Sequence, residues 1–164
     1  MNSVIIEGPD GGGKTTLAEA LLKELDLVYH HEGPPERGGL HDRYSALLRE
    51  NSVLDRWALS EAVYGSVCRG GSLLTPLELA KLLALARRAG AVSVLCLPPL
   101  EVCEAVWEAR KRSEYVTSAR ALREVYEAYR DTEELHDAVW DRSVTPLRAA
   151  VDRVKSLLRE RRSR

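Results

Sequence analysis

Residues 8–15 read GPDGGGKT and satisfy the pattern GxxxxGK(S/T), whose residue types are suited to holding phosphate. The segment follows a short apolar run and precedes a helical pattern, which is the setting that this chemistry requires. Glycines let backbone N–H groups turn toward an anion, and the amino terminus of the following helix adds positive charge. In such a loop Lys14 reaches the β- and γ-phosphates of ATP, and the Thr15 hydroxyl ligates Mg²⁺. We therefore expect ATP and Mg²⁺ as cofactors, bound by Gly8, Gly11, Gly12, Gly13, Lys14, Thr15 and Thr16.

A glycine-rich turn with a solvated Lys14 is the alternative interpretation of this segment. Glycine weakens helices and strands because it gives up more backbone freedom on folding than other residues. Four glycines between positions 8 and 13 are therefore costly unless the backbone needs them. Phosphate binding supplies that need.

Asp10, Asp55 and Arg56 are placed for further contacts to phosphate or metal. Asp10 lies inside the loop, where it would repel phosphates unless it contacts Mg²⁺, a water on the metal or the acceptor phosphate. Asp55 and Arg56 follow the apolar residues 53–54 at the end of a predicted strand. Ligands collect at the carboxyl ends of strands in open α/β sheets. We expect Asp55 to be a metal-side carboxylate and Arg56 to clamp a second phosphate, with a structural ion pair as the alternative.

Strand and helix patterns alternate along the whole chain. His30 and His31 are expected to end a strand rather than to bind a metal, because no third ligand follows at a useful spacing. The alternation predicts an α/β, three-layer P-loop NTPase fold with a five-stranded parallel sheet flanked by helices and a small helical lid. We expect one domain over residues 1–164, with the lid at about 108–120. The predicted strands are 4–7, 27–30, 53–55, 92–97 and 138–140, and the predicted helices include 14–25, 41–50, 58–68, 76–88 and 100–112.

Two helix starts carry a threonine followed by proline. At Thr75 the pair is followed by Glu78, which predicts a capping box with proline in the first turn. Thr145 also precedes a proline, and we expect it to open the last helix with the same cap chemistry.

The composition limits the location and the partners of the protein. A net charge of −1 over 164 residues creates no general field that favours nucleic acid or a membrane. The three cysteines, Cys68, Cys96 and Cys103, lack metal-ligand or redox spacing, which predicts free thiols in a reducing, cytoplasmic compartment. We expect no signal peptide before the phosphate loop, and no apolar run is long enough to span a bilayer.

Residues 55–65, DRWALSEAVYG, resemble the DR-aromatic-x-x-S-x-x-x-(Y/F) motif of thymidylate kinases, a family of P-loop kinases. Shorter segments agree in order with that family, and the resemblance covers most of the chain. It implies ATP-dependent phosphorylation of a nucleoside monophosphate acceptor. Asp55 would then orient the acceptor phosphate and the metal, while Arg56 and Arg37 would bind the monophosphate. The shorter segments are EGPD at 7–10, PER at 35–37 and LCLPPLE at 95–101.

The same resemblance assigns further residues to the acceptor. Tyr64 matches an aromatic residue that packs on the sugar and disfavours a 2′-hydroxyl. Ser60 matches a position near the substrate, although helix packing explains it equally well. Arg43 is the candidate to replace the base-reading arginine of the family.

Some thymidylate kinases place an arginine inside the phosphate loop, where this chain has Gly11. Phosphoryl transfer needs charge neutralisation at the transferring group, so the cation must come from elsewhere. Arg110 and Arg112 lie in the expected lid and are the candidates, with a basic helix end that complements its dipole as the alternative. Residues 141–145 lie where such kinases place an adenine-contacting loop.

We expect the acceptor to be a pyrimidine deoxynucleotide such as dTMP or a modified dUMP. The segment between Arg37 and Asp55 is shorter than in thymidylate kinases, where it supplies base contacts and part of a dimer face. Base preference and homodimer formation therefore stay open. One alternative is a kinase of a deoxynucleoside or of a hydroxymethylated base in DNA, the one case in which nucleic acid would be a partner. A nucleotide-binding switch without kinase activity is the other.

Overall fold

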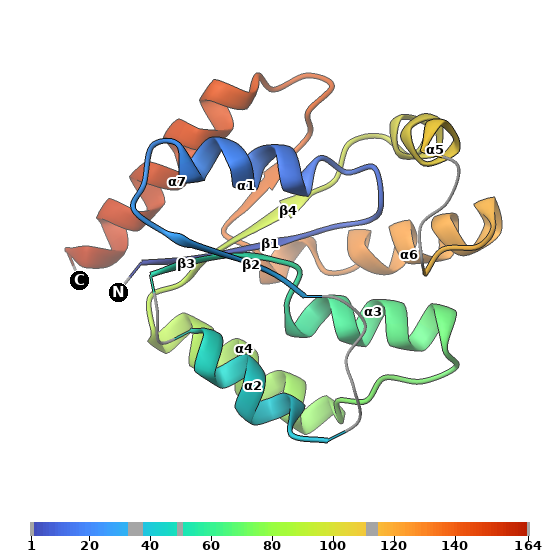
Figure 1. The fold of residues 1–164 in the computed structure, drawn as a ribbon, viewed down its shortest axis with the longest axis horizontal. Helices are drawn as coiled ribbons and strands as arrows, with labels where there is room; N and C mark the ends of the chain where they lie inside the picture. The colour runs from blue at the N-terminus through green and yellow to red at the C-terminus, as the bar shows by residue number, and fades with distance from the viewer. Residues whose placement is uncertain (1, 33–37, 49–50, 111–114, 164) are drawn as a thin grey trace.

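The computed structural model describes residues 2–32, 38–48, 51–110 and 115–163. Five parallel strands form one sheet in the order β2-β3-β1-β4-β5, with helices on both faces (Figure 1). This confirms the predicted three-layer α/β architecture. The strands are β1 (Ser3–Glu7), β2 (Val28–His31), β3 (Ser52–Asp55), β4 (Val92–Cys96) and β5 (Ala138–Trp140). The helices are α1 (Lys14–Leu22), α2 (Leu40–Leu47), α3 (Ala58–Cys68), α4 (Pro76–Arg88), α5 (Leu100–Ala109), α6 (Ala119–Arg130) and α7 (Leu147–Arg162), with a 3₁₀ turn at Glu133–Leu135.

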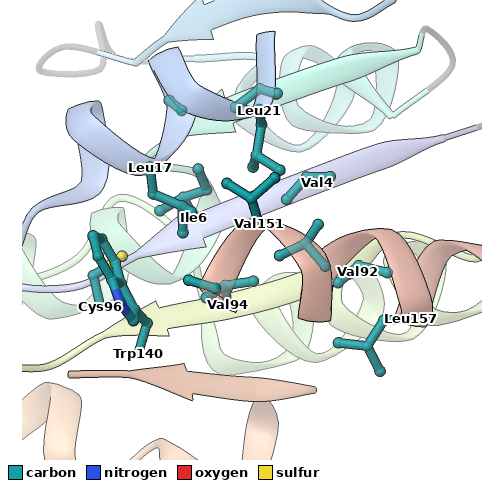
Figure 2. Packing of buried hydrophobic residues seen from close by; sticks show 14 of the residues in the cluster. Val4, Ile6, Leu17, Leu21, Val92, Val94, Cys96, Trp140, Val151 and Leu157 are labelled. Atoms are coloured by element: carbon teal, nitrogen blue, oxygen red, sulfur yellow. The ribbon is translucent and has the colours of Figure 1, made fainter. Parts of the chain in front are cut away.

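The central strand β1 is buried on both sides. Val4 and Ile6 point into the core that α1 and α7 cover, which Figure 2 shows around Leu17 and Val151. Ile5 points to the opposite face, into the core that α2 and α4 cover. A strand covered on both faces reads as a continuous apolar run instead of an alternating one, which is why the sequence identified it.

A third cluster of buried residues joins α3 to α6 beside the sheet. Tyr64 of α3 and Tyr129 of α6 both belong to it, together with Leu95 of β4. Figure 1 shows α3 and α6 on the same side of the sheet as α2 and α4. The inner face of α3, the helix that follows Asp55, is therefore covered by other elements. This packing fixes the direction of the helix and of its amino terminus.

The carboxyl ends of the strands lie together at one edge of the sheet. β1 pairs with β3 so that Ile6 is opposite Asp55, and β2 pairs with β3 so that His31 is also opposite Asp55. The phosphate loop leaves β1 at this edge, between β3 and β4. Residues far apart in sequence are thereby brought to one site.

The two predicted threonine caps behave differently. At α4 the Thr75 hydroxyl accepts from the Glu78 amide at 3.2 Å, and the Glu78 carboxylate accepts from the Thr75 amide at 2.8 Å, which confirms the capping box. The prediction for Thr145 is wrong, because α7 is preceded by Pro146 and has no side-chain cap. The third residue after Thr145 is Arg148, which cannot accept a hydrogen bond as Glu78 does.

Helix and strand ends differ from the predicted ones by a few residues. α1 ends at Leu22 instead of residue 25, because the amides of Glu24 and Leu25 turn back to the Leu21 carbonyl. The three cysteines are free thiols, as predicted. No helix within the described ranges is both long enough and apolar enough to cross a membrane.

Candidate active site

The phosphate loop packs closely on the neighbouring backbone. A Cβ atom on Gly8 would lie 2.3 Å from the Cys96 carbonyl oxygen of β4, so this position admits only glycine. Gly13 precedes α1 with a positive φ of 100°, and a Cβ there would lie 3.0 Å from Cδ of Arg142. Side chains rarely adopt that backbone conformation. The glycines predicted to cradle phosphate are therefore required by the geometry of the loop itself.

Lys14 lies folded against its own loop. Its Nζ donates to the Pro9 carbonyl at 2.8 Å, and the side chain is buried. Burial lowers the pKa of Lys14 to about 8; the charge of Arg56 acts in the same direction, while Asp10 and Asp55 oppose it. An anion bound at this position would offer its oxygens to Nζ in place of the carbonyl and would favour the charged form of Lys14.

Among the described residues, the hydrogen-bond partners of the Asp55 carboxylate all contact one of its two oxygens. Its Oδ2 accepts from the Thr15 hydroxyl at 2.9 Å and from the Tyr29 hydroxyl at 3.0 Å, and Nδ1 of His31 lies 3.6 Å from the same oxygen. Its Oδ1 is buried and has no hydrogen-bond partner among the described residues. A buried carboxylate oxygen in this state is costly unless a ligand completes it.

The Thr15–Asp55 pair fits Mg²⁺. Magnesium is usually held by one or two protein oxygens together with substrate phosphates and water, instead of by a full protein cage. The described part of the chain has no group of three or more His, Cys, Asp or Glu residues placed to hold a metal. Asp55 and Thr15 are the residues that would hold Mg²⁺, and this assignment stays a prediction.

Arg56 lies beside the loop in a constrained conformation. Its Nη2 forms an ion pair with Oδ1 of Asp10, and the Tyr64 hydroxyl donates to that same Asp10 oxygen at 3.2 Å. The Arg56 guanidinium carbon lies 4.5 Å from the centroid of the Tyr64 ring, a cation–π contact. Its Nη1 is buried without a hydrogen-bond partner in the described ranges. Arg56 therefore retains a donor for an anion.

These groups surround a cavity of about 150 Å³ at the carboxyl edge of the sheet. Arg110, one of the two predicted lid cations, lies in its wall. So does Arg142, from the loop after β5, whose buried Nε has no partner among the described residues. Four cationic side chains thus converge on a small space, as two phosphate groups would require. The lining residues are Asp10, Gly11, Gly13, Lys14, Thr15, Thr16, His31, Asp55, Arg56, Val106, Arg110 and Arg142.

Other predicted site residues have different surroundings. Ser60 is buried and bonded to Glu7, which supports the packing alternative for this position. Arg43 forms an ion pair with Glu32 at 2.9 Å. Its role as a base-reading residue stays a prediction. Arg37 and Arg112 lie outside the described residues.

Sequence reasoning did not assign Tyr29, His31 or Arg142 to the site. Tyr29 and His31 lie on the edge strand β2. Alternate residues of a strand point to the same face, so the spacing of these two residues was a weak signal that they share a site. Arg142 follows the last strand within the loop expected to contact adenine, and its charge beside a strand end was the usable signal.

A second cavity of about 350 Å³ lies beside the first. The Trp140 ring forms one wall, and its Nε1 donates to the Thr145 carbonyl at 3.0 Å. Asp141 accepts from the amide and the hydroxyl of Ser143, which fixes the loop after β5. Arg142 and Thr16 line both cavities, so a single extended ligand spanning them would contact both residues.

Several solved structures share this fold, and some of them are named as kinases. The YorR protein from Bacillus subtilis, in complex with phosphorylated GDP, has a TM-score of 0.81 and 23% identity, covering 99% of this chain and 98% of that chain. Deoxyadenosine kinase from M. mycoides, with products dCMP and a flexible dCDP bound, has a TM-score of 0.61 and 14% identity, covering 96% and 98%. Shikimate kinase from Acinetobacter baumannii has a TM-score of 0.58 and 16% identity, covering 97% and 93%.

At these identities the likeness shows the fold alone, which is that of the P-loop kinases. No family profile matches the sequence, and neither does any curated protein. The resemblance to thymidylate kinases therefore stays a prediction from sequence motifs.

Replacing Gly13 with alanine tests the geometry of the loop. We expect Gly13→Ala to destabilise the fold by about 1–2 kcal/mol, because alanine disfavours a positive φ. It should also weaken ATP binding at least about tenfold, because the first amides of α1 turn away from the phosphates. Urea unfolding and calorimetry measure the two effects.

Gly71→Ala is the matched control, because a Cβ at Gly71 meets nothing within 4 Å. It should leave both quantities unchanged. Normal ATP binding by Gly13→Ala would show that the loop does not need this conformation.

Proposed function

We propose that the protein is a P-loop kinase that transfers the γ-phosphate of ATP to a (deoxy)nucleoside monophosphate and so forms the diphosphate. The observation that carries this proposal is Nη1 of Arg56, which is buried without a hydrogen-bond partner among the described residues, on a side chain that lines the same cavity as Lys14 and Thr15. The phosphate loop accounts for the phosphates of ATP. Arg56 pairs with Asp10 through Nη2 and keeps Nη1 for a further anion, for which we propose the phosphate of a nucleotide acceptor.

In this reaction an acceptor phosphate oxygen forms a bond to the γ-phosphorus while the bond to the β,γ-bridging oxygen breaks and ADP leaves. The attacking oxygen is already ionised, so the protein has to place charge instead of removing a proton. Lys14 balances charge on the donor, and Arg56 holds the acceptor. Mg²⁺, when bound at Thr15 and Asp55, neutralises the charge on the β- and γ-phosphates.

We propose a pyrimidine deoxynucleotide, such as dTMP or a modified dUMP, as the acceptor. Support comes from the motif at residues 55–65 and from Tyr64, whose ring lies under Arg56 and whose hydroxyl reaches Asp10. The role of this ring on the sugar comes from the resemblance, because Tyr64 is buried and does not line the cavity described above. The M. mycoides kinase has the pyrimidine nucleotides dCMP and dCDP bound, which is compatible with such an acceptor on this fold.

A deoxynucleoside acceptor is the second candidate. The likeness to a deoxyadenosine kinase favours it, because an enzyme of this fold is named for that substrate. A nucleoside lacks the phosphate that Arg56 would bind. A nucleoside acceptor would therefore leave Nη1 of Arg56 unpaired, whereas a nucleoside monophosphate would pair with it.

A scan of acceptors with γ-labelled ATP tests the function. The panel contains ribonucleoside and deoxynucleoside monophosphates, deoxynucleosides, an oligonucleotide with a hydroxymethylated base, and shikimate. We expect label on deoxynucleoside monophosphates, and none with Lys14→Ala, which keeps its fold because Nζ contacts only the Pro9 carbonyl among the hydrogen bonds described. Label on nucleosides alone would sink the leading proposal, and ATP hydrolysis that no acceptor stimulates would indicate a switch.

Arg56→Ala separates acceptor binding from donor binding. We expect KM for the acceptor to rise about 100-fold, because a charged hydrogen bond to phosphate is lost, while KM for ATP changes less than about threefold. Steady-state kinetics measure both values. Arg153→Ala, on the exposed part of α7 where Arg153 pairs with Glu160 at 3.6 Å, is the control and should change neither. An equal rise in both KM values would contradict the assignment.

Arg110 and Arg142 should have different kinetic effects. We propose that the cavity beside Trp140 takes the adenine of ATP, so Arg142→Ala should raise KM for ATP about tenfold. Arg110 lies at the end of α5 toward the lid, and Arg110→Ala should lower kcat about 100-fold with a smaller change in KM. The two variants are compared at saturating acceptor. An unchanged kcat in Arg110→Ala would show that another residue neutralises the charge on the transferring phosphate.

A further inference from the structure

Glu7 is a buried carboxylate that the transfer reaction does not by itself require. It ends β1, directly before Gly8 of the phosphate loop, and is 1% exposed. Burial raises the pKa of Glu7, while hydrogen bonds from Ser60 and the charges of Arg56 and Lys14 oppose that rise. A carboxylate removed from water is costly unless hydrogen bonds satisfy it. Its partners therefore indicate its role.

Both oxygens of Glu7 accept hydrogen bonds from other elements. Oε1 accepts from the backbone amides of Trp57 at 3.1 Å and Ser60 at 3.3 Å. Oε2 accepts from the Ser60 hydroxyl and from the Tyr129 hydroxyl at 3.3 Å. The Ser60 and Tyr129 hydroxyls also lie 2.7 Å apart. One side chain on β1 thus joins the start of α3 to α6.

The contacts to α3 replace a helix cap. Trp57 is the N-cap residue of α3 and supplies no side-chain hydrogen bond of its own. In a capping box the amides of the N-cap residue and of the third helical residue are satisfied by side chains of the helix itself. Here those two amides, of Trp57 and Ser60, are both satisfied by Glu7 from the neighbouring strand. The start of α3 is therefore fixed by β1.

Arg56 lies at the point that these contacts fix. It has a φ of 75° and is the single non-glycine residue with a positive φ in the described ranges. Such a conformation costs on the order of 1 kcal/mol and persists only where surrounding contacts hold it. The Arg56 amide donates to the Ile6 carbonyl at 3.0 Å, and Glu7 holds the amide of the next residue. Ile6 and Glu7, the last two residues of β1, thus hold two successive backbone amides, that of Arg56 and that of the residue after it.

A second route runs through aromatic rings. The Tyr129 hydroxyl is bonded to Glu7, and the Tyr129 ring packs edge-on against Tyr64 with centroids 6.1 Å apart. Tyr64 in turn carries the Arg56 guanidinium on its face. Glu7 therefore supports Arg56 through its backbone and through the ring beneath its cation.

We propose that Glu7 is a positioning residue that holds Arg56 at a fixed place relative to the phosphate loop. The proposal rests on the function given above, in which Arg56 binds the acceptor phosphate. Glu7 is absent from the cavity lining that the described residues form, so it acts through Arg56 and not on substrate. Because Glu7 also precedes Gly8, one residue is joined to the donor loop by a peptide bond and to the segment that carries the acceptor arginine by a hydrogen bond.

Two substitutions at Glu7 separate geometry from charge. Glu7→Gln keeps the length of the side chain and an oxygen for the two amides, and the Ser60 and Tyr129 hydroxyls can accept from its NH₂ group. Glu7→Asp keeps the charge but is one methylene too short to reach both amides. We expect Glu7→Asp to raise KM for the acceptor at least about tenfold with KM for ATP within about twofold, and Glu7→Gln to stay within about threefold for both.

Val154→Ala is the control for general loss of stability. Val154 is a buried residue of α7, which covers the opposite face of the sheet, and its truncation lowers the melting temperature without touching α3. It should leave both KM values unchanged. If Glu7→Asp raises both KM values together, or changes neither, Glu7 has only a structural role and the proposal is overturned.

A measurement that needs no turnover distinguishes this proposal from the proposed function. The side-chain N–H signals of Arg56, assigned by their loss in Arg56→Lys, are followed by ¹⁵N NMR. We expect them to be protected in the wild type and in Glu7→Gln, and to exchange with solvent in Glu7→Asp. If no acceptor is phosphorylated but this pattern is seen, the function fails and the positioning role stands; unchanged Arg56 signals in Glu7→Asp overturn the role whatever the activity.

Discussion

β1 and β3 lie side by side at the centre of the sheet, with Ile6 opposite Asp55. The phosphate loop and the Asp55–Arg56 pair therefore leave the sheet at the same level. In a strand, a shift by one residue would turn the side chain of Asp55 to the other face. The Arg56 amide, bonded to the Ile6 carbonyl, continues this pairing one residue beyond the strand. The positions of Lys14, Asp55 and Arg56 relative to one another follow from this register.

The site concentrates charge that the fold balances only in part. Lys14 is satisfied by a carbonyl, Arg56 by Asp10, and Asp55 by two hydroxyls. One oxygen of Asp55 and one nitrogen of Arg56 stay unpaired within the described part of the chain, although both are buried. Such groups cost stability, and proteins retain them where a ligand completes them. These two atoms are the observations on which we propose a metal and a second anion at this site.

Close packing around the loop holds this arrangement in place. Gly8 and Gly12 lie against the backbone of Cys96, and α3 is capped from β1 by Glu7. Tyr64 and Tyr129 fill the space between α3 and α6. The side chains that meet the substrate therefore extend from elements whose ends are fixed, which suits a reaction that depends on the placement of charge.

Much of the fold was predictable because its signals are local. The apolar run of β1, the phosphate loop and the capping box of α4 each depend on neighbouring residues, and each is found where the sequence predicts it. Thr145 misled because α7 begins one residue later than predicted, after Pro146, and Thr145 is therefore not its N-cap residue. The early end of α1 was missed because the propensity of residues 23–25 does not reveal where a chain must turn toward the next strand.

The sequence alone determined the chemistry of the loop, since the spacing of Lys14 and Thr15 after the glycines is itself the phosphate-binding geometry. It also placed Asp55 and Arg56 at a strand end. Only the tertiary structure decided which side chains from other strands join them, namely Tyr29 and Arg142. Those contacts depend on strand order and on the packing of α3, and no local pattern encodes either, because they are set by long-range pairing.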